Sequence, residues 1–156
     1  MTAEVITIGD EVLRGEIVDS NKSHLSQRML ALELETARHV SVPDDPGMME
    51  EVLREAAARA RVVLVSGGLG PTRDDLTTEV LAATFGRKLV EHAPSLEAMR
   101  AFFQSVGREM APNNAKVTSI WSRAPVGLDV VPGWEGGGPR ARIALRFFKS
   151  IIAESK

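Results

Sequence analysis

The stretch VVLVSGGLGPTRDDLT, residues 62–77, decides the fold class of this chain. It begins with the apolar run Val62–Val65, passes through a loop with three glycines, and ends where an apolar helical pattern begins at Leu76. This pattern is typical of a buried strand, a tight loop and the start of a helix. In α/β proteins, ligands bind at such junctions, at the carboxyl ends of the strands. Glycines let the backbone approach a ligand, and a helix N-terminus offers N–H groups to an anion.

The segments on both sides of this junction alternate between strand and helix patterns. In chain order, they predict strands at 5–8, 36–42 and 62–65, and helices beginning at 19–21, spanning 49–60 and 76–85, and running from 94 to 106. Asp19 and Asn21 are interpreted as capping residues of the first of these helices, and Gly86 closes the third. The alternation favours an α/β fold with a parallel sheet and helices on both faces.

Beyond Asn114 the pattern is less regular. Short strands are predicted at 117–121 and 128–131, a glycine-rich turn at 134–139, and a final helix across 143–152. The pairs Phe102/Phe103 and Phe147/Phe148 are interpreted as core residues. Since there is neither an internal repeat nor a linker, residues 1–156 are predicted to form a single domain.

The composition excludes several functional classes for this chain. The 156 residues are 44% hydrophobic and 26% charged, as in a globular domain with a sizeable core. A net charge of -2 gives no electrostatic footprint for nucleic acid or a membrane surface. The chain has no cysteine, which excludes disulfides, thiolate catalysis and cysteine-ligated zinc. Without a signal-peptide pattern or an apolar stretch of about 20 residues, a cytoplasmic protein is expected.

The glycine loop is neither a Walker A loop nor a dinucleotide fingerprint. Its glycines either line a ligand site or serve only a tight turn. Of Asp74 and Asp75, one is expected to cap the following helix, which leaves the other free for chemistry. Because carboxylates repel phosphate, a diphosphate ligand would require a divalent cation between them. Alternatively, an aspartate accepts hydrogen bonds from a pterin or from ribose hydroxyls.

Two further polar segments are candidates for the same site. Gly9, Asp10 and Glu11 follow the first strand and should lie at the same edge of the sheet as the glycine loop; the alternative is a solvated turn. The second segment is Asn113-Asn114-Ala115-Lys116, in which the lysine can hold a phosphate. Its alternative is an ordinary polar loop.

Three segments resemble the N-terminal domain of the CinA (competence/damage-inducible) protein family, which is of the molybdopterin-binding, MoaB/Mog-like type. They are GDEVLRGEIVDSN at 9–21, SGGLGPTRDDLT at 66–77 and GREMAPNNAK at 107–116. The resemblance covers residues 3–132 and implies a three-layer α/β/α sandwich with a mostly parallel sheet. Residues 133–156 diverge from the family, since GWEGGGPR replaces its usual continuation and no Leu-Pro-Gly-Val-Pro motif follows.

The resemblance also implies a site. Asp74 and Asp75 are expected to be catalytic and to bind a divalent, Mg²⁺-type metal. The residues expected to bind the ligand are Gly9, Asp10, Glu11, Ser66, Gly67, Gly68, Gly70, Pro71, Thr72, Thr77, Asn114 and Lys116.

Three functions remain open at this stage. In CinA-like proteins this domain is linked to metal-dependent ADP-ribose pyrophosphatase activity, which implies binding of an ADP-containing nucleotide. In Mog-type relatives the pocket binds and adenylylates molybdopterin, an activity of molybdenum cofactor synthesis. The third function is a non-catalytic binding or oligomerisation module. The deamidase activity of the family's separate C-terminal domain is not expected here, whereas a homo-oligomer is, because relatives form dimers or trimers.

Overall fold

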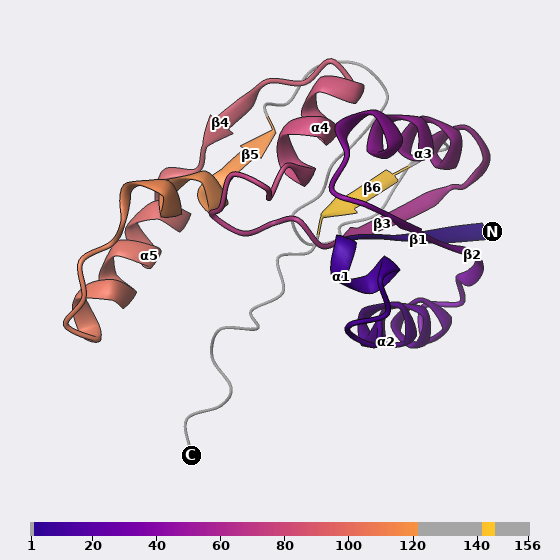
Figure 1. Cartoon of the computed structure of the whole chain (residues 1–156), viewed down its shortest axis with the longest axis horizontal. Helices are drawn as coiled ribbons and strands as arrows, with labels where there is room; N and C mark the ends of the chain where they lie inside the picture. Colours follow the sequence, from indigo (N-terminus) through magenta and orange to yellow (C-terminus); the bar gives the residue numbers. More distant parts are fainter. Residues whose placement is uncertain (1, 122–141, 146–156) are drawn as a thin grey trace.

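The computed structural model describes residues 2–121 and 142–145 (Figure 1). Its centre is a four-stranded sheet in the order β2-β1-β3-β6. The strands are β1 (Thr2–Ile8), β2 (Glu35–Val42), β3 (Val62–Ser66) and β6 (Arg142–Leu145), and every neighbouring pair is parallel. The α/β class and the first three predicted strands are therefore confirmed.

Helices cover both faces of this sheet (Figure 1). On one face, α3 (Pro46–Arg59) and α4 (Thr77–Thr84) pack against Ile6, Ile8 and the Val63/Val65 pair. On the other face lies α2 (Ser20–Leu30), whose Met29 belongs to a smaller core. That smaller core also contains Ala3, Leu34 and Val62. Because side chains alternate along a strand, β1 and β3 each supply residues to both layers. Complete burial of an aliphatic side chain stabilises the fold by about 1.5–3 kcal/mol.

Two helices begin at aspartates that cap them. The Asp19 carboxylate accepts the backbone N–H of Lys22 at 3.1 Å, which fixes the start of α2. Asp45 accepts the N–H of Met48 at 2.8 Å, and Pro46 occupies the first turn of α3. The capping interpretation of Asp19 is therefore confirmed. Of the helices within the described ranges, none combines the length and apolarity that crossing a bilayer requires.

Beyond α4 the chain extends away from the sheet as an arm (Figure 1). The arm consists of β4 (Leu89–Glu91), α5 (Ala93–Ser105), the 3₁₀ helix η1 (Pro112–Thr118) and β5 (Ser119–Trp121). Strands β4 and β5 pair antiparallel. The sequence pattern missed β4, a strand of three residues, and the predicted strand at 117–121 is shortened to β5 because η1 occupies the residues before Ser119.

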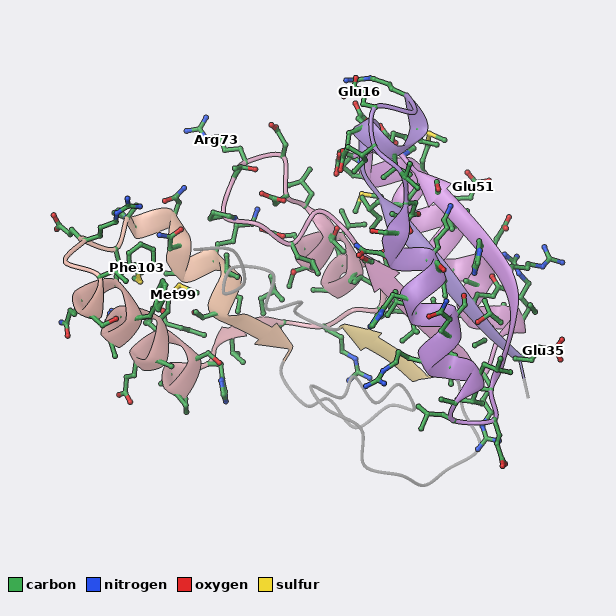
Figure 2. The ribbon with its side chains drawn as sticks, turned by 90° about the horizontal axis from the view of Figure 1, so that it is seen from below. Glu16, Glu35, Glu51, Arg73, Met99 and Phe103 are labelled. Atoms are coloured by element: carbon green, nitrogen blue, oxygen red, sulfur yellow. The ribbon has the colours of Figure 1, made fainter. Side chains whose placement is uncertain are left out.

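The core interpretation of Phe102 is wrong. Its side chain is 39% exposed, and its ring meets that of Phe103 edge to face, with centroids 5.9 Å apart. Figure 2 shows Phe103 and Met99 on α5, far from the sheet. On an arm with few neighbouring elements, a helix cannot bury two consecutive residues, since they point about 100° apart.

The predicted final helix is also wrong where the structure describes it. Residues 142–145 form β6, which pairs with β3 from Val62↔Arg142 to Val65↔Leu145. A short apolar run fits either a strand or a helix, and here it satisfies backbone groups along the edge of β3. The predictions for 128–131, 134–139, 146–152 and the Phe147/Phe148 pair lie outside the described residues.

Candidate functional site

The carboxyl ends of β1, β2 and β3 bring three loops together. Ile8 pairs with Val42, and Thr7 pairs with Ser66, so the loops that follow these strands leave the sheet side by side. The N–H of Gly9 donates to the carbonyl of Val42 at 3.0 Å. In Figure 2 the segments that carry Glu16 and Arg73 lie at this edge, and Glu35, at the start of β2, lies at the opposite one. The predicted meeting of the 9–11 segment with the glycine loop is confirmed.

Two glycines of the loop are required by its shape. Gly67 has φ +102°, and a β-carbon on it would lie 2.8 Å from the carbonyl carbon of Ile8 and closer still to its oxygen. Gly68 has φ +56°, and a β-carbon there would overlap Thr77 Oγ1. Both residues therefore combine a left-handed backbone with a close approach, which only glycine permits. The loop is a tight turn, and it lies at the edge where a ligand is expected.

Thr77 has a structural place in this turn. Its hydroxyl donates to the carbonyl oxygen of Gly67 at 2.8 Å, and its backbone N–H donates to the carbonyl oxygen of Gly68 at 3.2 Å. The residue is fully buried at the start of α4. Thr77 was predicted to bind the ligand directly, but its hydroxyl is used to hold the loop.

Asp75 does not cap α4, and neither does Asp74. The carboxylate of Asp75 turns back toward the loop and accepts hydrogen bonds from the backbone N–H of Thr72, at 2.9 Å, and from the Thr72 hydroxyl. The residue before α4 is Leu76, whose side chain makes no capping bond, and Asp74 is exposed. The capping prediction is wrong because a short aspartate side chain can bond to nearby loop amides as readily as to a helix end.

The bonds within this loop favour the ionised form of Asp75. Burial is the largest single influence on its pKa and acts upward. The hydrogen bonds from Thr72 and Gly70 and the charge of Lys116 act downward, and together they lower the pKa of Asp75 below its ordinary value. A carboxylate held in this way is a permanent acceptor at neutral pH.

Asp44, in the loop after β2, is a candidate that the sequence reasoning missed. Its carboxylate accepts the N–H of Asp10 at 3.2 Å, and its own N–H donates to the Asp10 carboxylate at 3.3 Å. Burial, followed by the negative charges of Asp10, Glu11 and Asp75, raises the pKa of Asp44. The available signal was its place in Pro43-Asp44-Asp45, directly after a predicted strand and at the same edge as Gly9.

The other residues of the 9–11 segment and Ser66 occupy the same edge. Asp10, the first residue of the short helix α1 (Asp10–Leu13), forms a 2.6 Å ion pair with Arg14, which directly follows that helix. Glu11 is exposed, with its carboxylate turned toward Gly9. Ser66 accepts a hydrogen bond at 2.9 Å from the side-chain amide of Asn21, which joins α2 to the end of β3. Asn21 lies inside α2, whose cap is Asp19, so the capping interpretation of Asn21 is wrong.

The 112–118 segment contacts the glycine loop through side chains. Asn113 donates to the carbonyl of Pro71 at 3.3 Å, and Lys116 donates to the carbonyls of Thr72, at 3.0 Å, and Asp75. Asn114 lies in the same turn, where its N–H bonds to the carbonyl of Ala111. The predicted approach of this polar segment to the loop is confirmed, while its contact with a ligand stays a prediction.

Residues 4–141 match the protein family described as a probable molybdopterin binding domain. The chain belongs to that family. The chain is similar in sequence to CinA-like proteins. A CinA-like protein of Anaeromyxobacter sp. (strain Fw109-5) is 42% identical to it over 136 residues. That alignment covers 87% of this chain and 32% of the relative. A putative competence-damage inducible protein of Clostridioides difficile (strain 630) is 41% identical over 116 residues, 74% of this chain and 28% of the relative.

This molybdopterin-binding-type chain spans about a third of the length of those curated relatives. Among solved structures, CinA of unknown function from Thermoplasma acidophilum has a TM-score of 0.70 and 29% identity, over 78% of this chain and 71% of the other. The tungsten cofactor synthesizing protein MoaB from Pyrococcus furiosus has a TM-score of 0.52 and 29% identity, over 68% and 64%. The resemblance to a CinA N-terminal domain of the MoaB/Mog type is thereby confirmed.

Proposed function

We propose that the edge formed by Gly9–Glu11, Asp44 and the glycine loop binds an ADP-containing nucleotide such as ADP-ribose, together with a divalent cation, and hydrolyses its diphosphate. The observation that carries this proposal is the set of carboxylates around Asp44. Asp44 and Asp10 each accept the other's backbone N–H, at 3.2 and 3.3 Å, and burial, followed by the charges of Asp10, Glu11 and Asp75, raises the pKa of Asp44. The mutual repulsion of these groups is the condition that a bound cation relieves.

The donor set fits a cation that is shared with a ligand. In the part of the chain that the structure describes, no group of three or more histidine, aspartate or glutamate side chains is placed to hold a metal alone. Mg²⁺ is commonly held by one or two carboxylates, with phosphate oxygens and water as its other ligands. Asp44 and Asp75 would supply the carboxylates, because both lie against the glycine loop, Asp44 near Gly68 and Asp75 near Gly70. The exposed Asp74 stays the next candidate.

Each part of the site would have a separate role in binding and hydrolysis. Gly67 and Gly68 permit the tight turn of the loop at this edge, and the diphosphate would lie against the loop's backbone. Asp75, ionised and fixed by Thr72, holds its carboxylate in one orientation. A bound cation would neutralise phosphate charge and supply an activated water. Asp10 and Glu11 flank the same edge, where they keep an anionic ligand from binding without a cation.

A second candidate is molybdopterin binding. It is favoured by the family to which the chain belongs and by the likeness to a MoaB protein named for tungsten cofactor synthesis. In this case Asp75 would accept hydrogen bonds from the pterin N–H groups, and no cation would be needed for affinity.

The test is to titrate ADP-ribose into the protein, by calorimetry, in Mg²⁺ and then in excess chelator. We expect chelation to weaken binding roughly 10- to 150-fold, the loss of about 1.5–3 kcal/mol typical of one contact to a charged group. Release of AMP in the presence of Mg²⁺ would support hydrolysis. Binding without AMP release would favour a non-catalytic module. If ADP-ribose fails to bind in either condition while molybdopterin binds regardless of chelator, the second candidate is correct.

A further inference from the structure

The side chain of Lys116 is surrounded by acceptors from the chain itself. Its ammonium group donates to the carbonyl of Thr72 at 3.0 Å and to the carbonyl of Asp75, and it forms an ion pair with Glu79 at 3.1 Å. A lysine ammonium has three N–H groups and no more. All three are therefore occupied without a ligand, which argues against the sequence prediction that Lys116 binds phosphate.

The loop between Gly70 and Asp75 is held from two sides. On one side, the carboxylate of Asp75 accepts the N–H of Thr72 and, in addition, that of Gly70. On the other side, side chains of η1 bind the loop carbonyls: Asn113 binds Pro71, and Lys116 binds Thr72 and Asp75. The amides of this short loop are thus held by Asp75, and its carbonyls are held by side chains of η1. Those side chains come from about 40 residues further along the chain.

The partial burial of Lys116 favours this arrangement. Its side chain is 25% exposed, so it is partly shielded from water. A buried ammonium group is costly unless it is paired, and two carbonyl dipoles and a carboxylate supply that pairing. Moving the loop away would break these two hydrogen bonds and the ion pair, so together they favour the shape of the loop seen here.

We infer that Lys116, supported by Asn113, is a positioning residue that sets the shape of the ligand-binding loop from the arm and does not itself touch the ligand. The inference rests on the proposed function for the identity of that ligand. The contacts of Lys116 with the loop are present in the ligand-free protein. Through η1, the arm then contributes to binding without lining the site.

The test compares Lys116→Met, Lys116→Arg and, as a matched control, Lys88→Met at an exposed lysine before β4. In the ligand-free protein, carbonyl ¹³C NMR signals of Thr72 and Asp75 should shift in Lys116→Met, because their hydrogen-bond donor is gone. The N–H of Thr72 should exchange with solvent about tenfold faster, as expected for loss of one charged hydrogen bond. Lys88→Met should change neither, and Lys116→Arg should restore part of the protection.

With ADP-ribose and Mg²⁺, Lys116→Met should then bind about tenfold more weakly. Unchanged carbonyl signals and exchange in the free protein, together with weaker binding, would overturn the inference and show that Lys116 contacts the ligand. If Lys116→Met does not fold, Asn113→Ala gives the same readout at the Pro71 carbonyl, and an unchanged signal there would also overturn it. If wild type binds no ADP-ribose, the proposed function fails, while the free-protein signals still decide the positioning role.

Discussion

Gly67→Ala should destabilise the protein by about 2–5 kcal/mol, a large part of the stability of a domain of this size. Two costs add up: the left-handed backbone at φ +102°, worth about 1–2 kcal/mol, and the overlap with the carbonyl of Ile8, worth about 1–3 kcal/mol or more. The clash is with backbone of the central strand, which cannot rotate away. Urea unfolding monitored by circular dichroism measures the effect.

Gly86→Ala is the matched control. Gly86 also has a left-handed backbone, φ +61°, but among the residues that the structure describes a β-carbon there would have no neighbour within 4 Å. Only the backbone cost applies, so a loss of about 1–2 kcal/mol is expected. Equal losses in the two variants would contradict the close approach between the glycine loop and the end of β1.

Asp44→Asn and Asp75→Asn should change stability in opposite directions while both weaken cation-dependent binding. The folded-state pKa of Asp44 is raised, so the folded protein loses stability as the pH rises from about 3.8 through that pKa; Asp44→Asn should therefore raise the melting temperature at pH 7. The folded-state pKa of Asp75 is lowered, so its contribution is present above about 3.8 and is lost as the pH falls through the folded pKa. Asp75→Asn should lower the melting temperature at pH 7.

Thermal melts between pH 3 and pH 8 measure both signs, and calorimetry with ADP-ribose and Mg²⁺ measures the binding. Each variant should bind roughly 10- to 150-fold more weakly, as expected for loss of one charged contact. A stabilised Asp44→Asn that loses binding would show that the repulsion among these carboxylates serves the site at the expense of stability. A destabilised Asp44→Asn would mean that the charges around Asp44 do not repel it as described.

The sequence allowed prediction of the elements with strong periodicity. The apolar, valine-rich run at Val62–Val65 and the apolar positions of α3 each fit a single structure, and Asp19 is a cap by residue type and position. Strand β4 has three residues and lacks a period of its own, because pairing with β5 defines it. The four residues of β6 are also too few to show a strand or a helix period, because pairing with β3 defines this strand.

The sequence predicted the position of the candidate site in the fold, but it did not predict the hydrogen bonds within the site. Strand order along the chain puts the loops after β1 and β3 at one edge, which is enough to select Gly9 and the glycine loop. The inward turn of Asp75 and the contact of Lys116 with loop carbonyls depend on the three-dimensional path of the arm. Asp44 was missed because two adjacent aspartates after a strand also fit a loop with a helix cap, which is the role of Asp45.

The most direct test of the account is to map ADP-ribose binding on the ¹⁵N-labelled protein by NMR, in Mg²⁺ and in chelator. We predict that the amide signals that move are those of Gly9 to Glu11, Asp44 and Gly67 to Thr72, and that most of the movement disappears on chelation. Signals of α5, such as that of Phe103, should stay in place, since the arm acts on the loop without lining the site. Movement confined to the arm, or none at saturating ADP-ribose and Mg²⁺, would contradict a nucleotide site at the carboxyl edge of the sheet.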